Sequence, residues 1–212
     1  MSLRLVLASN NAKKLVELRG LLSVLDLGLV AQSELGIAEA DEPHASFIEN
    51  ALLKARTAAQ ASGGAALADD SGLCVRALAG APGVVSAHFA GELDRRDGEP
   101  REARRARQDQ ANNALLLARL HGAADRSAHF ISTLVAVRHA DDPEPLIAVG
   151  RWPGQILLLP RGSGGFGYDP LVFIPDLNAS VAELDSATKN AHSHRALAAQ
   201  VLRQQLQQVW GV

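Results

Sequence analysis

Residues 65–75 of this 212-residue chain are Ala-Ala-Leu-Ala-Asp-Asp-Ser-Gly-Leu-Cys-Val, two short apolar runs around a pair of neighbouring carboxylates. The runs predict a pair of buried strands, with the motif Asp69-Asp70-Ser71-Gly72 between them. Adjacent carboxylates repel each other and lose hydration near a core, so such a pair usually faces something cationic. The alternative is a solvated turn closed by an aspartate side chain. The rest of the chain must decide between the two.

Composition limits the class of protein. Hydrophobic residues make up 47% of the chain, enough for the core of one large or two small domains. The formal net charge of −2 gives no basic field that would favour nucleic acid as a partner. A single cysteine, Cys74, fits a reducing compartment, and no apolar run suits a membrane span or a secretory signal. We therefore expect a cytoplasmic protein that binds neither nucleic acid nor membrane.

The N-terminal segment has the pattern of a strand, a polar loop and a helix. Leu3–Ala8 is a short apolar run, and leucines follow at helical spacing from Leu15 to Leu25. Between them, Ser9-Asn10-Asn11-Ala12-Lys13-Lys14 places two lysines in the first helical turn, where the helix dipole disfavours them unless an anion is bound. An asparagine N-cap explains the loop about as well. The two lysines favour phosphate, although the glycines of a Walker loop are absent.

An acidic loop and a second helix come next. The loop is Glu39–Pro43, and Ser46 with Glu49 forms a capping box that predicts a helix over Phe47–Ser62. Lys54 falls at the edge of the apolar stripe of this helix. Its ammonium either reaches water past the core or projects into a cleft between two lobes.

The remaining half is rich in strand patterns. We expect further strands at residues 27–32, 130–138, 146–152, 155–159 and 171–174. The charged segment 92–109 mixes both signs, which indicates a solvated helix or a mobile loop, and a helix is expected to continue over 114–120.

The loop Gly162–Pro170 combines four glycines with Phe166, Tyr168 and Asp169. Glycine lets the backbone approach a ligand closely or take a positive φ. A plain hairpin loop does not need two of the chain's few aromatic residues beside so much glycine. The composition therefore favours a ligand-binding loop that stacks a flat ring.

Basic residues gather before the last helix. Lys189, His194 and Arg195 lie near its N-terminus, where Ser193 can be the N-cap and where positive charge opposes the dipole. An anion or a keto oxygen would explain them. The spacing of His192 and His194 does not indicate a zinc site. The apolar positions of this helix are Leu197, Val201, Leu202, Leu206 and Val209.

Taken together, these motifs predict the ligand. The lysine-bearing segments suit a polyphosphate, the acidic residues suit a divalent cation, and the glycine-rich loop suits a flat base. The acidic group is Asp41, Glu42, Asp69 and Asp70. Hard oxygen ligands beside polyphosphate indicate Mg²⁺. A nucleoside triphosphate satisfies all three requirements, and the missing kinase and Walker signatures favour attack by water on a phosphoanhydride.

The ordered motifs resemble the inosine/xanthosine triphosphate pyrophosphatase family over nearly the whole chain. They are Ser9–Lys14, Phe47–Ala51 with Lys54, Ala68–Leu73, Gly80–Gly83, Gly164–Pro170 and Ser193–Arg195. The resemblance implies a mixed α/β fold with a long twisted sheet, flanking helices and two lobes around a deep central cleft, in a single domain over residues 1–212. It also implies a homodimer and Mg²⁺-dependent hydrolysis of ITP, dITP and XTP to the monophosphate and pyrophosphate.

The resemblance implies a role for each matching residue. Asp70 would be the catalytic base, supported by Asp69 and Lys54, and Glu42 or Asp41 would join Asp70 in binding the metal. The implied substrate-binding residues are Ser9, Asn10, Asn11, Ala12, Lys13, Lys14, Ser71, Phe166, Gly167, Tyr168, Asp169, Lys189, His194 and Arg195. Of these, Phe166 would stack on the base, and the last three would donate to it. Such donors suit the 6-keto group of hypoxanthine and xanthine and oppose the 6-amino group of adenine.

Some features depart from the family pattern, and other functions stay open. Ser9-Asn10 stands where relatives often have Thr-Gly, and the arginine-rich stretch Arg95–Arg107 is longer than the family leads us to expect. The alternatives are a Maf-like pyrophosphatase with a pyrimidine or modified-base preference, a nucleotide-binding sensor without catalysis, and a structural α/β domain whose charges pair internally.

Overall fold

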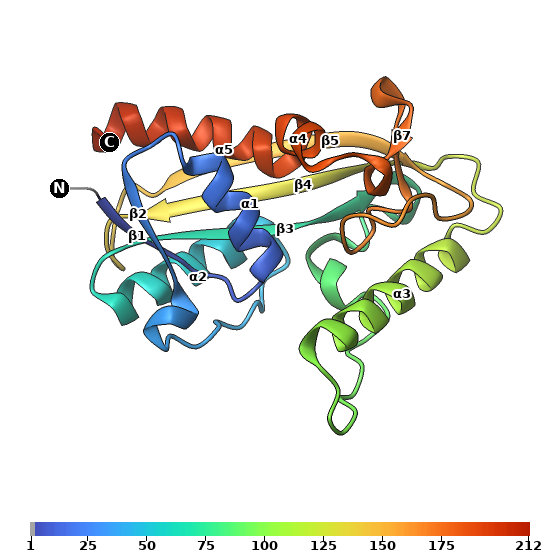
Figure 1. Ribbon diagram of the computed structural model, residues 1–212, viewed down its shortest axis with the longest axis horizontal. Helices are drawn as coiled ribbons and strands as arrows, with labels where there is room; N and C mark the ends of the chain where they lie inside the picture. The colour runs from blue at the N-terminus through green and yellow to red at the C-terminus, as the bar shows by residue number, and fades with distance from the viewer. Residues whose placement is uncertain (1–2) are drawn as a thin grey trace. The chain divides into compact units, whose positions relative to one another are not determined.

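The computed structural model describes residues 3–212, within which seven strands form one mixed sheet with the order β2-β1-β3-β4-β5-β6-β7 (Figure 1). The strands are β1 Leu3–Leu7, β2 Leu27–Ala31, β3 Ala65–Val75, β4 Ser127–Val137, β5 Leu146–Ile156, β6 Val172–Ile174 and β7 Ala179–Ser180. The helices are α1 Ala12–Leu22, α2 Phe47–Ser62, α3 Arg101–Arg119, α4 Ser186–His192 and α5 His194–Gln205. Strand β1 is parallel to β2 and β3, whereas β6 is antiparallel to β5 and β7. The predicted mixed α/β class is confirmed.

The chain divides into two compact units. The first runs up to Ser71 and includes Ser132–Arg151 and Asn190–Val212, and the second comprises Gly72–Ile131 and Trp152–Lys189. No helix within residues 3–212 has the length and apolar character that crossing a membrane requires.

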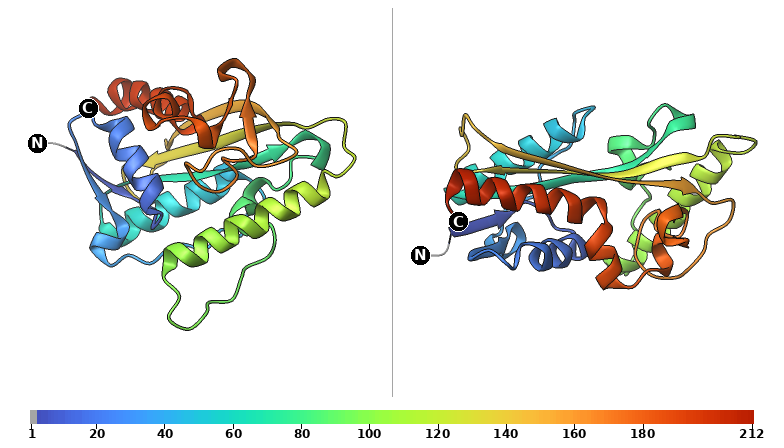
Figure 2. Two further views of the ribbon diagram at one scale, coloured as in Figure 1. Left: turned by 45° about the vertical axis from the view of Figure 1, so that its right-hand side comes forward. Right: turned by 90° about the horizontal axis from the view of Figure 1, so that it is seen from above.

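The first unit has a separate core on each face of its strands. Side chains alternate between faces along a strand, so Ala65 and Leu67 of β3 pack with α1 and α5, whereas Ala66 and Ala68 pack with α2. Figure 2 shows α1 and α5 on one face of these strands and α2 on the other. The same alternation directs Asp69 toward α1 and α5, and Asp70 toward α2.

Strand β3 is continuous through the acidic motif, so the predicted pair of strands is wrong, and so is the alternative of a solvated turn. Asp69 is 2% exposed and Asp70 is 4% exposed within one eleven-residue strand. Buried carboxylates persist in a strand only when cations or hydrogen-bond donors meet them. Those partners come from other elements, which the local sequence does not reveal.

Strand β5 is also longer than predicted, because it passes through Pro153 instead of ending before it. Strand β6 pairs with Gln155 and Ile156, beyond the proline, so the missing N–H removes no bond to β6. The proline side chain faces solvent. The segment predicted as two strands is therefore one.

Helix α5 lies against the backbone of β5. A Cβ atom on Gly150 would lie 2.0 Å from the carbonyl oxygen of His194 and 2.5 Å from the amide nitrogen of Ala198. Only glycine allows this approach, which fixes the start of α5. The predicted Ser193 cap is confirmed, since its Oγ accepts from the amide of Ala196. The predicted apolar face is partly wrong, because α5 buries Ala198, Ala199 and Leu202 and leaves Leu197 and Val201 partly exposed.

The second unit packs α3 against the short strands. Leu116 and Leu120 are fully buried in one core with Val172 of β6. Helix α3 begins within the charged segment, so the helical alternative for residues 92–109 holds from Arg101 onward. Arg107 donates to Glu99 and Arg104 donates to the carbonyl of Leu93, which ties the preceding loop to the helix.

Candidate active site

Asp69 is the centre of a buried ion cluster on the α1 and α5 face of the first unit. Its Oδ2 lies 3.0 Å from Nζ of Lys14 and accepts from Nε and Nη2 of Arg195 at 3.2 and 3.1 Å. Its Oδ1 accepts from Oγ of Ser132 at 2.7 Å, and Ser71 also donates to Oδ2. This carboxylate connects α1, β4 and α5 to β3.

Arg195 is buried, with 1% of its surface exposed, and its guanidinium is bound on several sides. Beyond the two bonds to Asp69, Nη1 pairs with Glu17 of α1 and Nη2 donates to Oγ of Ser71 at 3.0 Å. The planar guanidinium presents its five donors in a fixed fork, which suits two carboxylates at once. The structure therefore places Arg195 in the ion cluster.

The charges of this cluster stabilise one another. Burial alone would raise the pKa of Asp69, but Lys14 and Arg195 outweigh it and hold that pKa far below its usual value. Burial also lowers the pKa of Lys14, against the pull of Asp69. Asp69 is therefore a permanent anion that holds two cations in place.

Lys54 meets Asp70 on the opposite face. It is 6% exposed, and its Nζ donates to Oε1 of Glu42 at 2.5 Å, to the carbonyl of Asp69 at 3.0 Å and to Oδ1 of Asp70 at 3.1 Å. An ammonium has three donors, and all three are used. Small neighbours on α2, Ala51, Ala55 and Ala58, bring the helix close enough to the sheet for this contact. The predicted position in which the ammonium reaches water is wrong, since Lys54 is buried among these three acceptors.

Asp70 has one bound oxygen and one open oxygen. Oδ1 accepts from Lys54, whereas the buried Oδ2 has no hydrogen-bond partner. Burial raises the pKa of Asp70, with the nearby Glu42 adding to the effect and Lys54 opposing it. A buried acceptor without a donor is costly in a folded protein. The chemistry of this atom therefore suits a proton, a water molecule or a metal ion.

Asn50, which is fully buried on α2 one turn before Lys54, holds the backbone two residues after Glu42. The Asn50 side chain accepts from the amide of His44 at 2.9 Å and donates to its carbonyl at 3.1 Å, which ties the acidic loop to the helix. Asp41 is exposed. Across residues 3–212, no three acidic, histidine or cysteine side chains gather into a metal-binding group. The structure thus pairs Glu42 with Asp70 through Lys54 and does not bring Asp41 into one ligand set with them.

The loop before α1 has the predicted asparagine cap. Oδ1 of Asn11 accepts from the amides of Lys13 and Lys14, and Ser9 Oγ accepts from the amide of Asn11. Asn10 Oδ1 accepts from the buried side chain of Gln32. Ala12 opens the helix, as the first residue of α1. The cap and the positive charge coexist, because Lys14 turns toward Asp69.

The predicted residues of the glycine-rich loop form a second group with Lys189, within the second unit. Oδ2 of Asp169 accepts from the amide of Phe166 and from Nζ of Lys189, each at 2.9 Å. The Lys189 ammonium lies 4.7 Å from the centre of the Phe166 ring, a cation–π distance. Gly165 has a φ of +72°, and a Cβ there would lie 2.0 Å from Asp169 Oδ2. The glycine is required on both grounds.

Tyr168 and Gly167 complete this group. Tyr168 is buried, its hydroxyl donates to the carbonyl of Ser86 at 2.8 Å, and burial with the nearby Asp109 raises its pKa. Gly167 binds α3 through its amide and its carbonyl. The three predicted base donors are divided, because Lys189 lies with Phe166, whereas Arg195 and the 7% exposed His194 belong to the first unit.

Several residues of these groups were missing from the sequence prediction. Glu17 follows Lys13 and Lys14 at the i+4 and i+3 positions on α1, a spacing that puts it beside them. Ser132 is a polar residue within an apolar strand run, which was a usable signal. No sequence signal marked Asp109 and Asn113, since a helix with charges of both signs is equally typical of a solvated surface.

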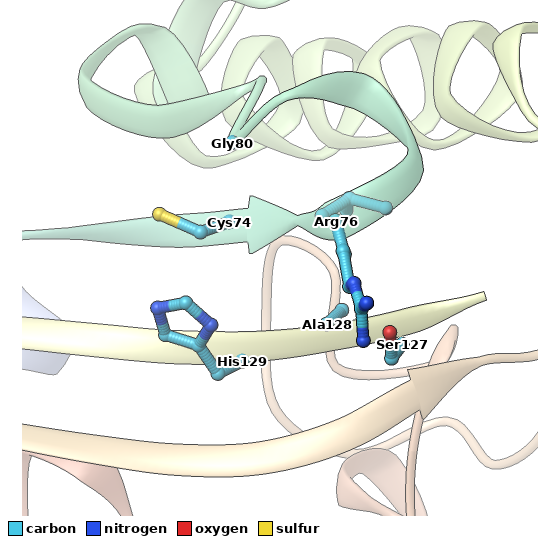
Figure 3. A pocket seen from close by; sticks show the side chains of 7 residues that line it. Cys74, Arg76, Gly80, Ser127, Ala128 and His129 are labelled. Atoms are coloured by element: carbon cyan, nitrogen blue, oxygen red, sulfur yellow. The ribbon is translucent and has the colours of Figure 1, made fainter. Parts of the chain in front are cut away.

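The second unit also has a surface pocket of about 300 Å³ that contains none of the predicted site residues. It is lined by Cys74, Val75, Arg76, Gly80, Ser127, Ala128 and His129. Figure 3 shows Cys74 and His129 extending from the neighbouring strands β3 and β4. The pocket is distinct from both groups described above.

Comparison with known proteins assigns the family. The family model described as Ham1 family matches residues 5–205. This chain belongs to the Ham1 family. A protein named dITP/XTP pyrophosphatase from Methylibium petroleiphilum is 66% identical over 93% of this chain and 94% of its own length. One of the same name from Leptothrix cholodnii is 63% identical over 98% of this chain and 99% of its own length.

Solved structures agree with this assignment. A HAM1 protein from Coxiella burnetii superposes with a TM-score of 0.84 at 40% identity, covering 95% of this chain and 97% of that one. The Staphylococcus aureus Ham1 protein gives a TM-score of 0.79 at 33% identity over 95% and 96% of the two chains. The Ham1 fold therefore spans both units of this chain.

Proposed function

We propose that this Ham1-family chain hydrolyses non-canonical purine nucleoside triphosphates such as dITP, ITP and XTP to the monophosphate and pyrophosphate. Its relatives named dITP/XTP pyrophosphatase match over almost their whole length. The observation that carries the proposal is Asp70, a buried carboxylate with one oxygen on Lys54 and the other without a partner. These products require the α–β phosphoanhydride bond to break while the oxygen of a water molecule bonds to one of the two phosphorus atoms that the bridge joined.

Asp70 is the proposed general base. A base works best when its pKa lies near the working pH, and burial raises the pKa of Asp70 in that direction. Its open Oδ2 has two lone pairs, so it can accept a proton from the attacking water on one and face a metal ion with the other. Lys54 keeps the carboxylate oriented through Oδ1 and supplies positive charge for the phosphate oxygens as negative charge develops on them.

We assign the divalent cation, Mg²⁺, to Asp70 and Glu42. The unpartnered Oδ2 of Asp70 and the half-exposed carboxylate of Glu42 are hard oxygen donors, both held by one ammonium. Mg²⁺ commonly uses one or two carboxylates and takes its other ligands from substrate phosphates and water, so a third carboxylate such as Asp41 is not required. When bound, the ion would neutralise charge on the triphosphate.

The substrate contacts follow the two groups of residues. We assign the triphosphate to Ser9, Asn10, Asn11, Ala12, Lys13 and Lys14, with Ser71 beside them, because the start of α1 carries two lysines and the positive end of the helix dipole. We assign the base to Phe166, Gly167, Tyr168 and Asp169. Lys189, His194 and Arg195 are the donors implied for its keto group, and Arg195 also donates to Asp69. The homodimer implied by the resemblance is a further proposal, for sedimentation to test.

Pyrophosphate release from dITP, XTP, GTP, ATP and UTP, with Mg²⁺ and with a chelator, tests the proposal. We expect metal-dependent release from dITP and XTP, with slow turnover of the others. A preference for UTP would indicate the Maf-like alternative. Binding of dITP without any release would indicate a sensor and overturn the hydrolase.

A further inference from the structure

Two side chains of α3, one helical turn apart, bind both sides of Gly167. Oδ2 of Asp109 accepts from the Gly167 amide at 2.8 Å, and Nδ2 of Asn113 donates to the Gly167 carbonyl at 3.0 Å. The amide belongs to the peptide group that joins Phe166 to Gly167, and the carbonyl belongs to the next one. The pair therefore fixes the two peptide planes that define φ and ψ of Gly167.

Gly167 needs this restraint because a glycine has no side chain to anchor its backbone. Its φ is +63°, a conformation that glycine adopts at little cost but leaves as easily. A Cβ added there would meet no atom within 4 Å, so the space on that side of its Cα is open. The two bonds from α3 are the restraints that the structure shows on this residue's backbone.

The restraint extends to Phe166. The Phe166 amide donates to Asp169 Oδ2 at 2.9 Å, and its carbonyl accepts from the Asp169 amide at 3.2 Å. With the following peptide group held by Asp109, the direction of the Phe166 Cα–Cβ bond is fixed. The ring then lies 4.7 Å from the Lys189 ammonium.

Helix α3 is a firm support for this contact. Leu116, one turn beyond Asn112, is fully buried, and Asn112 donates to the carbonyls of Ser86 and Ala87. Gln108 donates to the carbonyl of Gly91 at 2.8 Å. A group is positioned more sharply when it is held from a packed helix than from a loop alone.

We propose that Asp109 and Asn113 are positioning residues that set the Phe166 ring for stacking on the base. This rests on the proposed function, in which Phe166 stacks on a purine. Neither side chain needs to touch the substrate. Their effect is on affinity for the base, and the phosphate chemistry of Asp70 is untouched.

Four variants separate the roles of the two side chains. Asp109→Ala and Asn113→Ala each remove one bond to Gly167. Asp109→Asn keeps an acceptor of the same shape and is the conservative rescue. Asn113→Asp keeps the size but, when ionised, offers no donor to the Gly167 carbonyl. Gln110→Ala, at an exposed position on the same helix, is the matched control.

The readouts are KM and kcat for dITP, and the inhibition constant of inorganic tripolyphosphate, which has no base. We expect Asp109→Ala and Asn113→Asp to raise KM for dITP by about five- to tenfold, less than the loss of a whole stacked base, with kcat within about twofold. The tripolyphosphate constant stays unchanged. Asp109→Asn and Gln110→Ala stay close to the unmodified chain.

The outcomes distinguish this inference from the function beneath it. If the unmodified chain turns over dITP but KM stays constant in Asp109→Ala and Asn113→Asp, the positioning role is overturned alone. A parallel rise in the tripolyphosphate constant would reveal a general structural defect and overturn it as well. No release from dITP by the unmodified chain would overturn the proposed function and this inference together.

Discussion

On the face of β3 that packs with α1 and α5, the carboxylate of Asp69 accepts from Lys14, Arg195 and two serines. On the face that packs with α2, the carboxylate of Asp70 accepts from Lys54 alone and keeps one buried oxygen without a partner. The two residues are neighbours in one strand and equally buried. The difference lies wholly in what the other elements bring to each face.

This difference assigns separate tasks to two identical side chains. A carboxylate with both oxygens engaged and a depressed pKa stays charged and holds elements together. A carboxylate with an open oxygen and a raised pKa retains capacity for a proton or a metal. We therefore expect substitutions at Asp69 to act on stability and substitutions on the α2 face to act on turnover.

The largest effect is expected for Asp70→Asn. The amide has nearly the shape of the carboxylate but is not a base, so pyrophosphate release from dITP should fall by about 10³-fold or more. The melting temperature should not fall, since burial already disfavours the charged form. Turnover near that of the unmodified chain would show that Asp70 is not the base.

Asp69→Ala should have the largest effect on folding. It leaves the guanidinium of Arg195 and the ammonium of Lys14 without their shared anion, and breaking a buried ion pair from one side costs about 3–5 kcal/mol. Urea unfolding gives this quantity. Asp97→Ala, at an exposed aspartate, is the control and should change it by less than about 0.5 kcal/mol. If Asp69→Ala lowers the free energy of unfolding by no more than the control does, Asp69 does not have the structural role that separates it from Asp70.

Local signals in the sequence predicted much of this arrangement. Ser46 and Gly63 bound α2 as predicted, with Ser46 Oγ accepting from the Glu49 amide and Gly63 in the left-handed region. Ser193 begins α5. Each of these features depends on residues within one helical turn, so a short stretch of sequence contains the whole cause.

The predictions that were wrong or incomplete share one physical cause, which is that the residues concerned bind side chains far away in the sequence. Continuity of β3 depends on Lys14, Lys54 and Arg195, the last of which is 126 residues from Asp69 in the chain. The position of Arg195 near a helix start was visible in the sequence, whereas its bonds to Asp69 come from a strand far away in the chain. Sequence patterning predicts which groups are charged and buried, and only the fold decides which of them meet.

Lys54→Met tests the α2 face without touching a carboxylate. Loss of the ammonium removes a donor from Asp70 and from the developing phosphate charge, so kcat should fall by about 10²-fold. Lys54 also lowers the pKa of Asp70 against burial, so the acidic limb of the pH–rate profile should move to higher pH. Arg56→Met, exposed on the same helix, is the matched control and should leave both unchanged.

The two carboxylates should also give opposite pH dependences of stability. The pKa of Asp69 is lower in the folded state than in the unfolded state, so its contribution is complete above about pH 4 and is lost as the pH falls further. The pKa of Asp70 is raised, so its contribution is present at low pH and is lost as the pH rises through the raised value. Urea midpoints between pH 3 and 7 should therefore decline less on acidification in Asp69→Asn, and should rise at neutral pH in Asp70→Asn. If the urea midpoints of the two variants depend on pH in the same way, Asp69 and Asp70 do not differ in their effect on stability.

Ser132→Ala is expected to give the smallest effect. It removes one donor, at 2.7 Å, from a carboxylate that keeps its bonds to Lys14 and Arg195, so unfolding should become easier by about 1–2 kcal/mol. Ser127→Ala on the same strand, whose hydroxyl bonds an exposed aspartate, should change it by less than about 0.5 kcal/mol. Because Ser132 acts only through Asp69, its variant should lose stability while KM and kcat for dITP stay constant. Loss of turnover at unchanged stability would show that Asp69 acts in catalysis, and the two faces of β3 would then not have separate roles.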